Sequence, residues 1–457
     1  MKKTFYRLFT ALFLAICLLP TAGLLITGPS PTVGNESPAP APALTRPDGS
    51  LNPQFLSDAA GWFSQRFAFR PALITADSTL KATLFHTSAQ PAVALGQEGW
   101  LYYAETLDGF TGAATLSPRQ STCIAASLSQ AQAYAESQGA AFLFTIAPNK
   151  ASLYPQFLPP ALQGQAAPQA YTAPVAEALA GQGVAYADLF VPFRAQEEIL
   201  YFATDSHWTN QGAALAHDVL LQALGLPGAA FEKAGGYQPT HRGDLHEMLY
   251  PASGLLEQEF TFTQPLSFRY ARPIRDVDDL RIETTGPAST APLLMFRDSF
   301  GNALHSLMAE SFSAALFSRA MPYNMLLISQ SDARYVVVEI VERNLPLLAQ
   351  APFLLPAPTA TLPGPAAACP APATLTAEPA ANLPGYSRVT GAVPTPCDSD
   401  SPVYLALPTG QVYQAQPTDT GAPAPTVAFT AYLPEGVDAA GLQIVFRQAG
   451  QWLAASP

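Results

Sequence analysis

Two short segments of the chain combine residue types that suit acyl transfer. In the first, residues 204–212, Asp205 stands two positions before His207, and a helix is predicted to begin at residue 210. A carboxylate that accepts a hydrogen bond from Nδ1 of a histidine fixes the ring tautomer and leaves Nε2 free as a base. This pair therefore supplies a general base and the group that orients it.

The second segment, residues 294–302, places Ser299 on a sharp turn between an apolar strand and a helix, with Gly301 two residues later. Functional groups in parallel α/β sheets gather outside the carboxyl ends of the strands. A serine there presents its hydroxyl outward, and N–H groups at the helix start can stabilise an oxyanion. Ser299 is therefore a candidate nucleophile for His207 and Asp205.

Both segments also have a purely structural interpretation. An Asp-x-His pair can be a helix cap beside a satisfied histidine, and a serine at a strand-to-helix turn can be a cap as well. Spacing alone leaves both interpretations open. The occurrence of both segments in one α/β domain raises the odds of the catalytic one.

The elements that must position these residues are read from apolar runs that alternate with helical segments. They predict an α/β fold with a mostly parallel sheet covered on both faces. The expected strands are 93–95, 100–103, 140–147, 184–189, 292–296, 314–317 and 335–340. The expected helices are 51–85, 117–138, 170–182, 210–223 and 301–309.

Composition divides the rest of the chain. Residues 28–50 and 351–384 are rich in Pro and Ala, which predicts a stalk and a linker around a catalytic domain at 51–350. Short alternating segments separated by turn residues predict a small all-β module at 385–457.

Residues 1–27 predict export. Lys2, Lys3 and Arg7 precede an apolar run long enough to cross a bilayer core of about 30 Å, so the rest of the chain should lie outside the cell membrane. A cleaved signal peptide and an uncleaved signal anchor both fit, and continued apolarity through residues 24–26 slightly favours the anchor. The expected location is a single span with an extracytoplasmic catalytic domain, or secretion after cleavage.

Charge and cysteine usage exclude some functions. With 22 Lys and Arg against 34 Asp and Glu, the net charge of −12 argues against a nucleic-acid partner. No Cys-x-x-Cys or Cys/His zinc spacing occurs, so neither a metal nor a cofactor is predicted. His241 and His246 are expected in a loop that lines the cleft. Cys369 and Cys397 are either a disulfide or two thiols.

The motif Asp-Ser-His-Trp-Thr at 205–209, with Asp-Ser-Phe-Gly later at 298–301, resembles SGNH-hydrolase-like proteins of the alginate O-acetyltransferase type, especially the bacterial DHHW proteins. Ser206 stands where the DHHW name expects a second His, while the His before Trp is present. Further pieces match in the family's order, so that the likeness covers about residues 50–350. These pieces are 62–67, 96–102, 147–155, 243–245 and 336–343.

The resemblance implies an SGNH-type three-layer fold in which the Asp–His pair precedes the Ser in sequence. It also implies that Ser299 takes an acetyl group as an ester and passes it to a polysaccharide hydroxyl or to water. His207 would act as base and then as acid, and Asp205 would orient it. The backbone N–H of Ser299 and the Asn149 side chain would hold the oxyanion.

The resemblance also suggests substrate contacts at Arg297, Trp208 and Lys150, of which Arg297 suits an acidic sugar. Asn149 and Lys150 are equally well explained as turn chemistry with a surface cation, and Arg297 as a structural or solvated arginine.

Three functions fit these observations: an O-acetyltransferase of a cell-surface or secreted polysaccharide, a polysaccharide O-acetylesterase, and a non-catalytic glycan-binding protein. Members of the family usually work beside a multi-span membrane acyltransferase that moves acetyl groups across the bilayer. This chain has one candidate span, so such a partner is expected as its acetyl donor.

Overall fold

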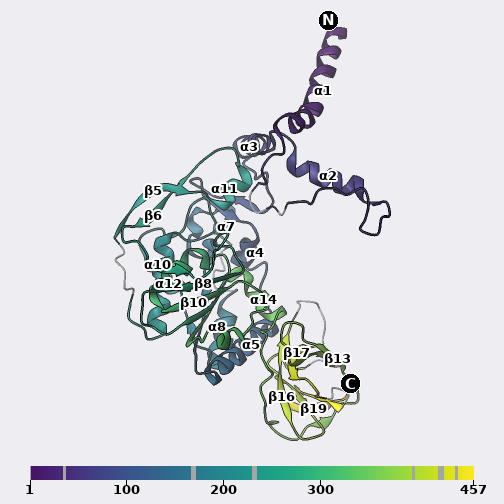
Figure 1. The fold of residues 1–457 in the computed structure, drawn as a ribbon, viewed down its shortest axis with the longest axis vertical. Coiled ribbons are helices and arrows are strands. Elements are labelled where there is room, and N and C mark those ends of the chain that lie inside the picture. The colour runs from purple at the N-terminus through teal and green to yellow at the C-terminus, as the bar shows by residue number, and fades with distance from the viewer. Residues whose placement is uncertain are drawn as a thin grey trace.

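The computed structural model describes residues 2–33, 36, 38–165, 171–228, 234–393, 397–419, 427–437 and 441–457. Parts of the expected stalk and β module, and residue 170 of the expected helix 170–182, lie outside these ranges. A long N-terminal helix, α1 (Lys2–Thr27), reaches away from a mixed α/β domain, and a sheet-rich C-terminal region lies at the opposite end (Figure 1).

Seven strands form the sheet of the α/β domain, in the order β4-β3-β11-β9-β10-β8-β7. The first five are parallel to one another, while β8 and β7 pair antiparallel at one edge. This confirms the predicted fold class. The strands are β3 (Ala141–Ala147), β4 (Tyr186–Ala187), β7 (Arg269–Tyr270), β8 (Arg281–Thr285), β9 (Leu293–Phe296), β10 (Ala314–Ser318) and β11 (Tyr335–Val341).

Helices cover both faces of this sheet because its central strands are apolar on both sides. All four residues of β9 are buried, and successive residues enter opposite apolar clusters. One cluster includes α10 (Asn210–Ala223) and α12 (Gly301–Ser311). The other includes α5 (Pro118–Ser137), α8 (Ala173–Gln182) and α14 (Leu345–Gln350).

Smaller elements complete the domain. The expected hairpin is present as β1 (Val93–Leu95) and β2 (Leu101–Tyr103), and an unexpected one pairs β5 (Gly235–His241) with β6 (Glu257–Phe262). The short helices are α4 (Glu105–Thr111), α6 (Lys150–Leu153), α7 (Pro160–Gln163), α9 (Phe190–Arg194), α11 (Asp244–Leu249) and α13 (Leu327–Gln330), with 3₁₀ turns at Pro155–Phe157 and Glu342–Asn344.

The helix expected over residues 51–85 is interrupted. It consists of α2 (Phe55–Arg66), α3 (Arg70–Leu80) and a π-helical turn at Lys81–Phe85. Phe69 takes a left-handed φ of 65°, and Pro71 lies in the first turn of α3, where proline is tolerated. The break therefore comes from a local backbone turn within an otherwise helical stretch.

An eight-stranded sheet forms the C-terminal region, in the order β12-β19-β18-β15-β16-β17-β14-β13. It contacts α5, where the buried Gln130 side chain donates to the carbonyl of Ala415 at 3.2 Å. Its strands are β12 (Ala367–Ala368), β13 (Thr374–Pro379), β14 (Tyr386–Ala392), β15 (Val403–Ala406), β16 (Val412–Thr418), β17 (Ala428–Pro434), β18 (Gln443–Gln448) and β19 (Gln451–Ala455).

One feature of this region differs from the sequence interpretation: strands β12 and β13 lie within 351–384, the segment interpreted as a linker. Of the two states left open for Cys369 and Cys397, the structure has the free thiols.

Candidate active site

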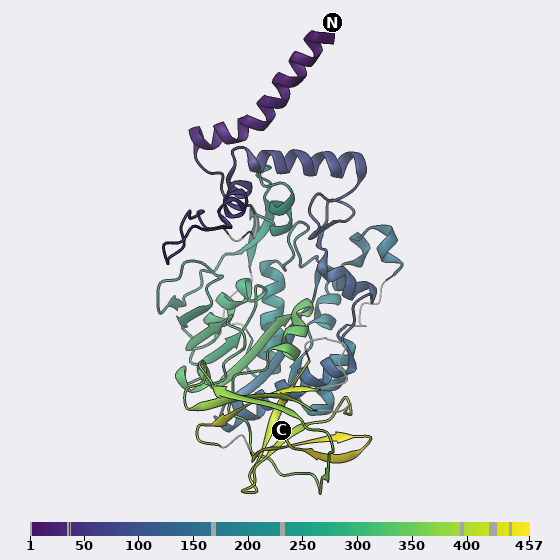
Figure 2. The ribbon, with the colours of Figure 1, turned by 90° about the vertical axis from the view of Figure 1, so that its right-hand side faces the viewer.

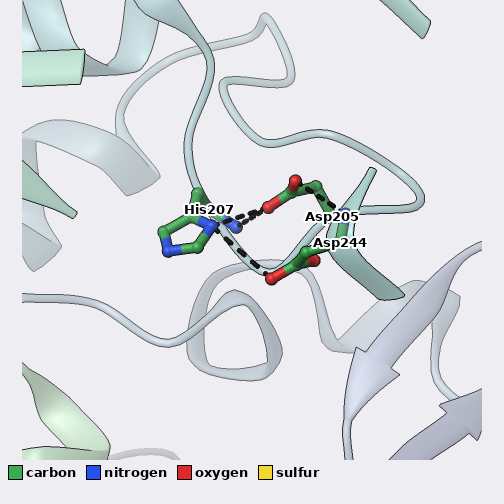
Figure 3. Close-up of side chains that lie close together, drawn as sticks. All are labelled: Asp205, His207 and Asp244. Atoms are coloured by element: carbon green, nitrogen blue, oxygen red, sulfur yellow. Dashed lines mark hydrogen bonds and ion pairs between the residues drawn. The ribbon is translucent and has the colours of Figure 1, made fainter. Parts of the chain in front are cut away.

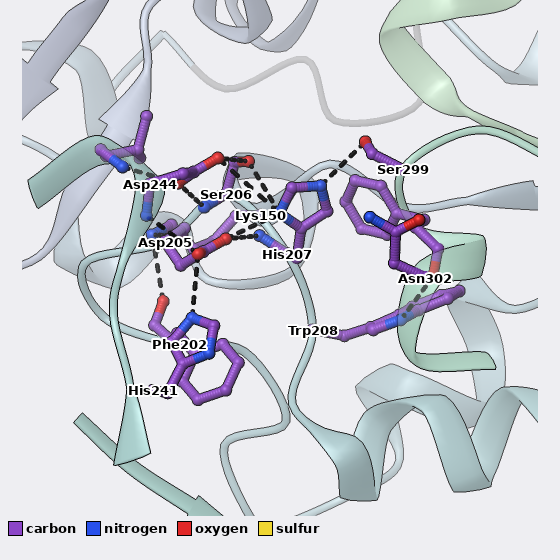
Figure 4. A network of polar contacts seen from close by, with 12 residues as sticks. Lys150, Phe202, Asp205, Ser206, His207, Trp208, His241, Asp244, Ser299 and Asn302 are labelled. Atoms are coloured by element: carbon purple, nitrogen blue, oxygen red, sulfur yellow. Dashed lines mark hydrogen bonds and ion pairs between the residues drawn. The ribbon is translucent and has the colours of Figure 1, made fainter. Parts of the chain in front are cut away.

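Ser299 and His207 lie in hydrogen-bond contact although they are far apart in sequence. His207 Nε2 lies 2.8 Å from Ser299 Oγ, and His207 Nδ1 lies 2.7 Å from Asp205 Oδ1 (Figure 4). The three side chains therefore form one chain of hydrogen bonds in the order that a nucleophile, a base and an orienting carboxylate require.

The turn that presents Ser299 is built around Arg297. This side chain is only 1% exposed, and its guanidinium donates to the carbonyls of Asp298 and Val277 and to Asn302 Oδ1. A Cβ on Gly301 would lie 2.6 Å from Arg297 Cδ, so only glycine leaves room for the arginine. Burial lowers the pKa of Arg297 to about 10.

Asp298 fixes the same turn from the other side. Its Oδ1 accepts the N–H of Phe300, and its Oδ2 accepts the N–H of Val341 at the end of β11. The Ser299 turn is thus held between β9 and β11. Arg297, expected to contact substrate, instead lies beneath the turn and supports it.

Lys150 supports the segment that carries Asp205. It is 4% exposed, and its Nζ donates to the carbonyls of Phe202, Ala203 and Asp205, the last at 2.6 Å. Burial lowers the pKa of Lys150 to about 8. Lys150 was a second expected substrate contact, but because it is buried in this position it is not among the residues that line the cleft.

Trp208 connects the segment of Asp205 and His207 to the Ser299 turn. Its indole N–H donates to the carbonyl of Phe300 at 3.1 Å, and its ring stacks on Phe193. Although Trp208 borders the cleft, it is 1% exposed, so its main contacts are within the protein. Thr209 follows it as the N-cap of α10, accepting the N–H of Gly212.

A second carboxylate and a second histidine surround Asp205. Asp205 Oδ2 accepts the Nε2–H of His241 at 2.9 Å and the backbone N–H of Asp244 at 3.0 Å (Figure 4). Asp244 Oδ2 accepts the Ser206 hydroxyl at 2.6 Å and lies 3.7 Å from His207 Nδ1 (Figure 3). Ser206, the departure from the DHHW pattern, thus links Asp244 to the site.

Asp205, His207 and Asp244 each offer a ligand atom within 4.8 Å of the others, a spacing that a metal ion would also suit (Figure 3). Every oxygen of the two carboxylates, however, already accepts a hydrogen bond from protein N–H or O–H groups. The two carboxylates are therefore part of a hydrogen-bonded network.

The surroundings of these groups lower the pKa of Asp205 and raise the pKa values of His207 and Asp244. Burial would raise the pKa of Asp205, but the hydrogen bonds and charges of His207 and His241 outweigh it and hold that pKa well below the usual value. Burial would lower the pKa of His207, yet the hydrogen bond and charge of Asp205 raise it above 6.5. Burial and the Asp205 charge raise the pKa of Asp244.

A cleft of about 1100 Å³ opens above Ser299 and His207. The Arg343 guanidinium borders it, held over the rings of Tyr103 and Phe300 at 5.4 and 5.6 Å. The lining carries charges of both signs, at Glu105, Asp205, Asp244, Glu259, Asp278, Arg242, Arg319 and Arg343. Such a mixed, open surface suits a polar substrate.

Asn149, the expected side-chain oxyanion donor, comes from the end of β3, at the same sheet edge as Ser299. Its backbone N–H donates to Glu342 Oε2 at 2.9 Å, and its Oδ1 is buried without a hydrogen-bond partner. Asn149 is not among the residues that line the cleft, so the geometry does not link it to Ser299.

Sequence reasoning assigned no catalytic contact to His241 or Asp244. His241 was expected only in a cleft-lining loop, where it does lie, and Asp244 only as part of a matching motif. Gly243 makes their approach possible, because a Cβ there would lie 2.4 Å from Thr204 Oγ1. The signal in the sequence was therefore the Gly-Asp-Leu motif at 243–245.

Known proteins with similar sequences indicate which family this chain resembles. Residues 74–279 match the family model described as "SGNH hydrolase-like domain, acetyltransferase AlgX", a range that includes Asp205 and His207 and ends before Ser299. The probable alginate O-acetylase AlgJ of Pseudomonas putida (strain KT2440) is 27% identical over 288 residues, which cover 56% of this chain and 71% of that protein.

Among solved structures, the O-acetyltransferase domain of P. putida AlgJ is 21% identical, with a TM-score of 0.40, and the match covers 56% of this chain and 93% of that one. A DHHW family protein from Eubacterium siraeum is 15% identical, with a TM-score of 0.42, and the match covers 56% of this chain and 95% of that one. The match of residues 74–279 confirms the predicted resemblance: these residues are similar to the SGNH hydrolase-like domain of the AlgX acetyltransferase type.

Proposed function

We propose that this chain is an exported SGNH-type acyltransferase that moves an acetyl group onto a hydroxyl of a cell-surface or secreted polysaccharide. The observation that carries the proposal is the continuous hydrogen-bond chain from Ser299 through His207 to Asp205 beside an open cleft. Similarity to the AlgX-type domain and to a probable alginate O-acetylase supports acetyl as the transferred group.

In the first half-reaction, Ser299 Oγ attacks the carbonyl carbon of an acetyl donor while His207 Nε2 takes its proton. Asp205 stabilises the positive charge on the ring, and the backbone N–H of Ser299 is the donor that we expect to stabilise the oxyanion. When the intermediate collapses, His207 gives the proton to the leaving group. The acetyl group then remains on Ser299 as an ester.

In the second half-reaction, a sugar hydroxyl gives its proton to His207 and attacks the ester carbonyl. His207 returns the proton to Ser299 as the acetylated sugar leaves. The open cleft supports a sugar polymer as acceptor, because a chain can lie across it. Water in place of the sugar would give acetate, which is the esterase alternative.

The N-terminus supports an extracytoplasmic location. By length and composition, α1 is the one helix in the described part of the chain able to cross a membrane. A single span cannot carry acetyl groups through the bilayer, so a multi-span membrane acyltransferase is the proposed donor. The catalytic domain would then meet its polysaccharide outside the cell membrane.

The test is acetyl transfer from a chromogenic acetyl ester to a panel of oligosaccharides, read by mass spectrometry. We expect an acetylated oligosaccharide with the wild type and with the control variant Ser306→Ala. Ser306 lies in α12, the helix that follows the Ser299 turn. Ser299→Ala should give none. Release of acetate without transfer to any oligosaccharide would favour the esterase. A folded wild type that shows neither activity would favour a binding protein.

A further inference from the structure

Helix α3, which lies near α1 at one end of the α/β domain, carries with the turn after it an apolar surface that faces away from the protein. Leu73, Leu80, Leu84 and Phe85, in α3 and the π-helical turn after it, are 50%, 53%, 65% and 65% exposed. Leu73 and Leu80 share one face of α3, at i and i+7, with Asp77 between them, and Leu84 and Phe85 follow in the π-helical turn. We call these four residues the apolar stripe.

The opposite side of α3, which contacts the rest of the α/β domain, carries Thr75 and Ser78 beside the half-buried Ile74. Thr75 Oγ1 accepts the N–H of Ala252 at 3.0 Å, and Ser78 is the only residue of α3 that is buried. A helix on a soluble domain normally buries its apolar face and exposes its polar face. The stripe departs from this pattern, because its four large apolar side chains are at least half exposed, which indicates that another apolar phase covers it.

The position of α3 identifies that phase. The N–H of Ala68, next to α3, donates to the carbonyl of Pro20 in α1 at 3.3 Å. Gly23 of α1 packs so closely that a Cβ there would lie 2.4 Å from Ala68 Cβ. Both views place α2 and α3 between α1 and the α/β domain, with α3 crosswise to the long axis of the molecule (Figures 1 and 2).

We propose that the apolar stripe binds the outer surface of the bilayer that α1 spans, so that the domain rests on the membrane through α3. Amphipathic helices lie in this way with their apolar side chains in the boundary between headgroups and acyl chains. Lys81 beside the stripe pairs with Asp77 at 2.8 Å, so apolar contact, and not attraction to anionic lipid, drives the binding.

This docking has a consequence for the catalytic cleft. Helix α11 contacts α3, and its first residue, Asp244, lines the cleft. When the stripe is bound to the membrane, α11 is the element that connects α3 to the cleft, so the cleft is held near the bilayer surface. The inference rests on α1 as a membrane span but is independent of the proposed acyl transfer.

The test uses the full chain reconstituted into phosphatidylcholine vesicles with brominated acyl chains, which quench tryptophan emission. Leu80→Trp probes the stripe, with Leu84→Trp as a second position if the first fails to fold. Ala377→Trp, exposed on β13 at the opposite end of the molecule, is the matched control (Figure 1). Each variant is compared with the wild type to remove the emission of the native tryptophans.

We expect lipids brominated near the headgroup to quench the added emission of Leu80→Trp several-fold more than that of Ala377→Trp. Acrylamide in the water should quench it less. Leu14→Trp, in α1, should respond best to bromine deep in the bilayer. Equal quenching at positions 80 and 377 would overturn the proposal, and so would a Leu14→Trp that no lipid quenches.

A second copy of the chain is the competing occupant. In detergent without vesicles, the proposal predicts that the shielding of Leu80→Trp from acrylamide does not depend on protein concentration. Shielding that grows with concentration and persists without quenching by vesicle lipids would assign the stripe to a dimer and refute membrane docking.

Discussion

At the scale of single residues, the site depends on a carboxylate surrounded by donors. Asp205 accepts the N–H and Nδ1–H of His207 on one oxygen, and His241 and the backbone N–H of Asp244 on the other. These donors keep the pKa of Asp205 well below its usual value despite burial. Asp205 is therefore an anion at every pH at which His207 can act as a base.

The raised pKa of His207 predicts the acid limb of the activity profile. Only neutral His207 can accept the Ser299 proton, and the hydrogen bond and charge of Asp205 outweigh burial to stabilise the protonated ring. Ester hydrolysis should therefore rise with pH, with a midpoint above the usual histidine value of about 6.5. A kcat/KM profile measures it, and a midpoint below that value would contradict the assignment.

His241 acts on the same profile through Asp205. His241→Phe keeps the stack on Phe202 but removes the donor and its positive charge. The full charge of Asp205 then acts on His207, so the acid limb should move up by about one pH unit while KM stays unchanged. His241→Gln, which restores a donor, should move it less. Identical profiles for both variants would show that His241 has only a packing role.

At the scale of elements, Glu342 joins two strand ends at the edge of the sheet that carries the site. It follows β11, and its Oε2 accepts the Asn149 N–H after β3 and the Ser152 hydroxyl at 2.8 Å. Burial raises the pKa of Glu342 to about 7. The folded chain thus binds this proton more tightly than the unfolded chain, in which the pKa is about 4.5.

This predicts a stability that falls as pH rises. The contribution of Glu342 is fully present below pH 4.5 and is lost as pH rises through about 7, a loss on the order of 3 kcal/mol. Urea unfolding at pH 5 and pH 8 measures it, with Glu342→Gln as the comparison. The difference between the two pH values should be smaller in the variant. An equal difference in both proteins would assign the pH dependence to other groups.

Elements and motifs with a local signal were predictable. The apolar runs of β3, β9 and β11 and the motifs around His207 and Ser299 lie in short stretches of sequence, so the sheet and the three central side chains were expected where they are. The hairpin of β5 and β6 was missed because β5 is almost wholly exposed and lacks apolar alternation.

The roles of two charged residues could not be predicted because their burial depends on the tertiary fold. Arg297 and Lys150 were candidate substrate contacts, with a structural or solvated arginine and a surface cation as the alternatives. Each donates to carbonyl oxygens that are distant in sequence, Lys150 to those of residues 202–205 and Arg297 to that of Val277. The sequence around either residue does not indicate that these distant carbonyl groups will be its acceptors. The same holds for His241, whose partner Asp205 belongs to another loop.

At the scale of the whole molecule, the C-terminal sheet packs on the α/β domain. Gln416 of β16 donates to the carbonyl of Phe353 at 2.8 Å, and Arg119 of α5 donates to the carbonyl of Ser399 at 3.0 Å. A chain ending at residue 356, before the segment that carries β12 and β13, should therefore unfold at a lower temperature, because α5 loses its cover. Below that temperature it should still hydrolyse acetyl esters, since the cleft residues lie in the α/β domain.

Scanning calorimetry and ester hydrolysis of the truncated chain measure both effects. An unchanged melting temperature would mean that the contacts with α5 add nothing to stability. Loss of hydrolysis by a chain that is still folded would place part of the catalytic machinery in the C-terminal sheet.

The most direct measurement for the whole account is the mass of the protein after brief exposure to an acetyl ester. Nucleophilic catalysis by Ser299 predicts a covalent acetyl adduct, mapped by peptide digestion to residue 299. Ser299→Ala should lack it, with turnover lower by several orders of magnitude, because an oxyanion site alone retains only about 10³–10⁴ over water. Ser306→Ala should carry it as the wild type does. An adduct that persists in Ser299→Ala, or turnover that does not fall, would contradict the assignment of Ser299 as the nucleophile.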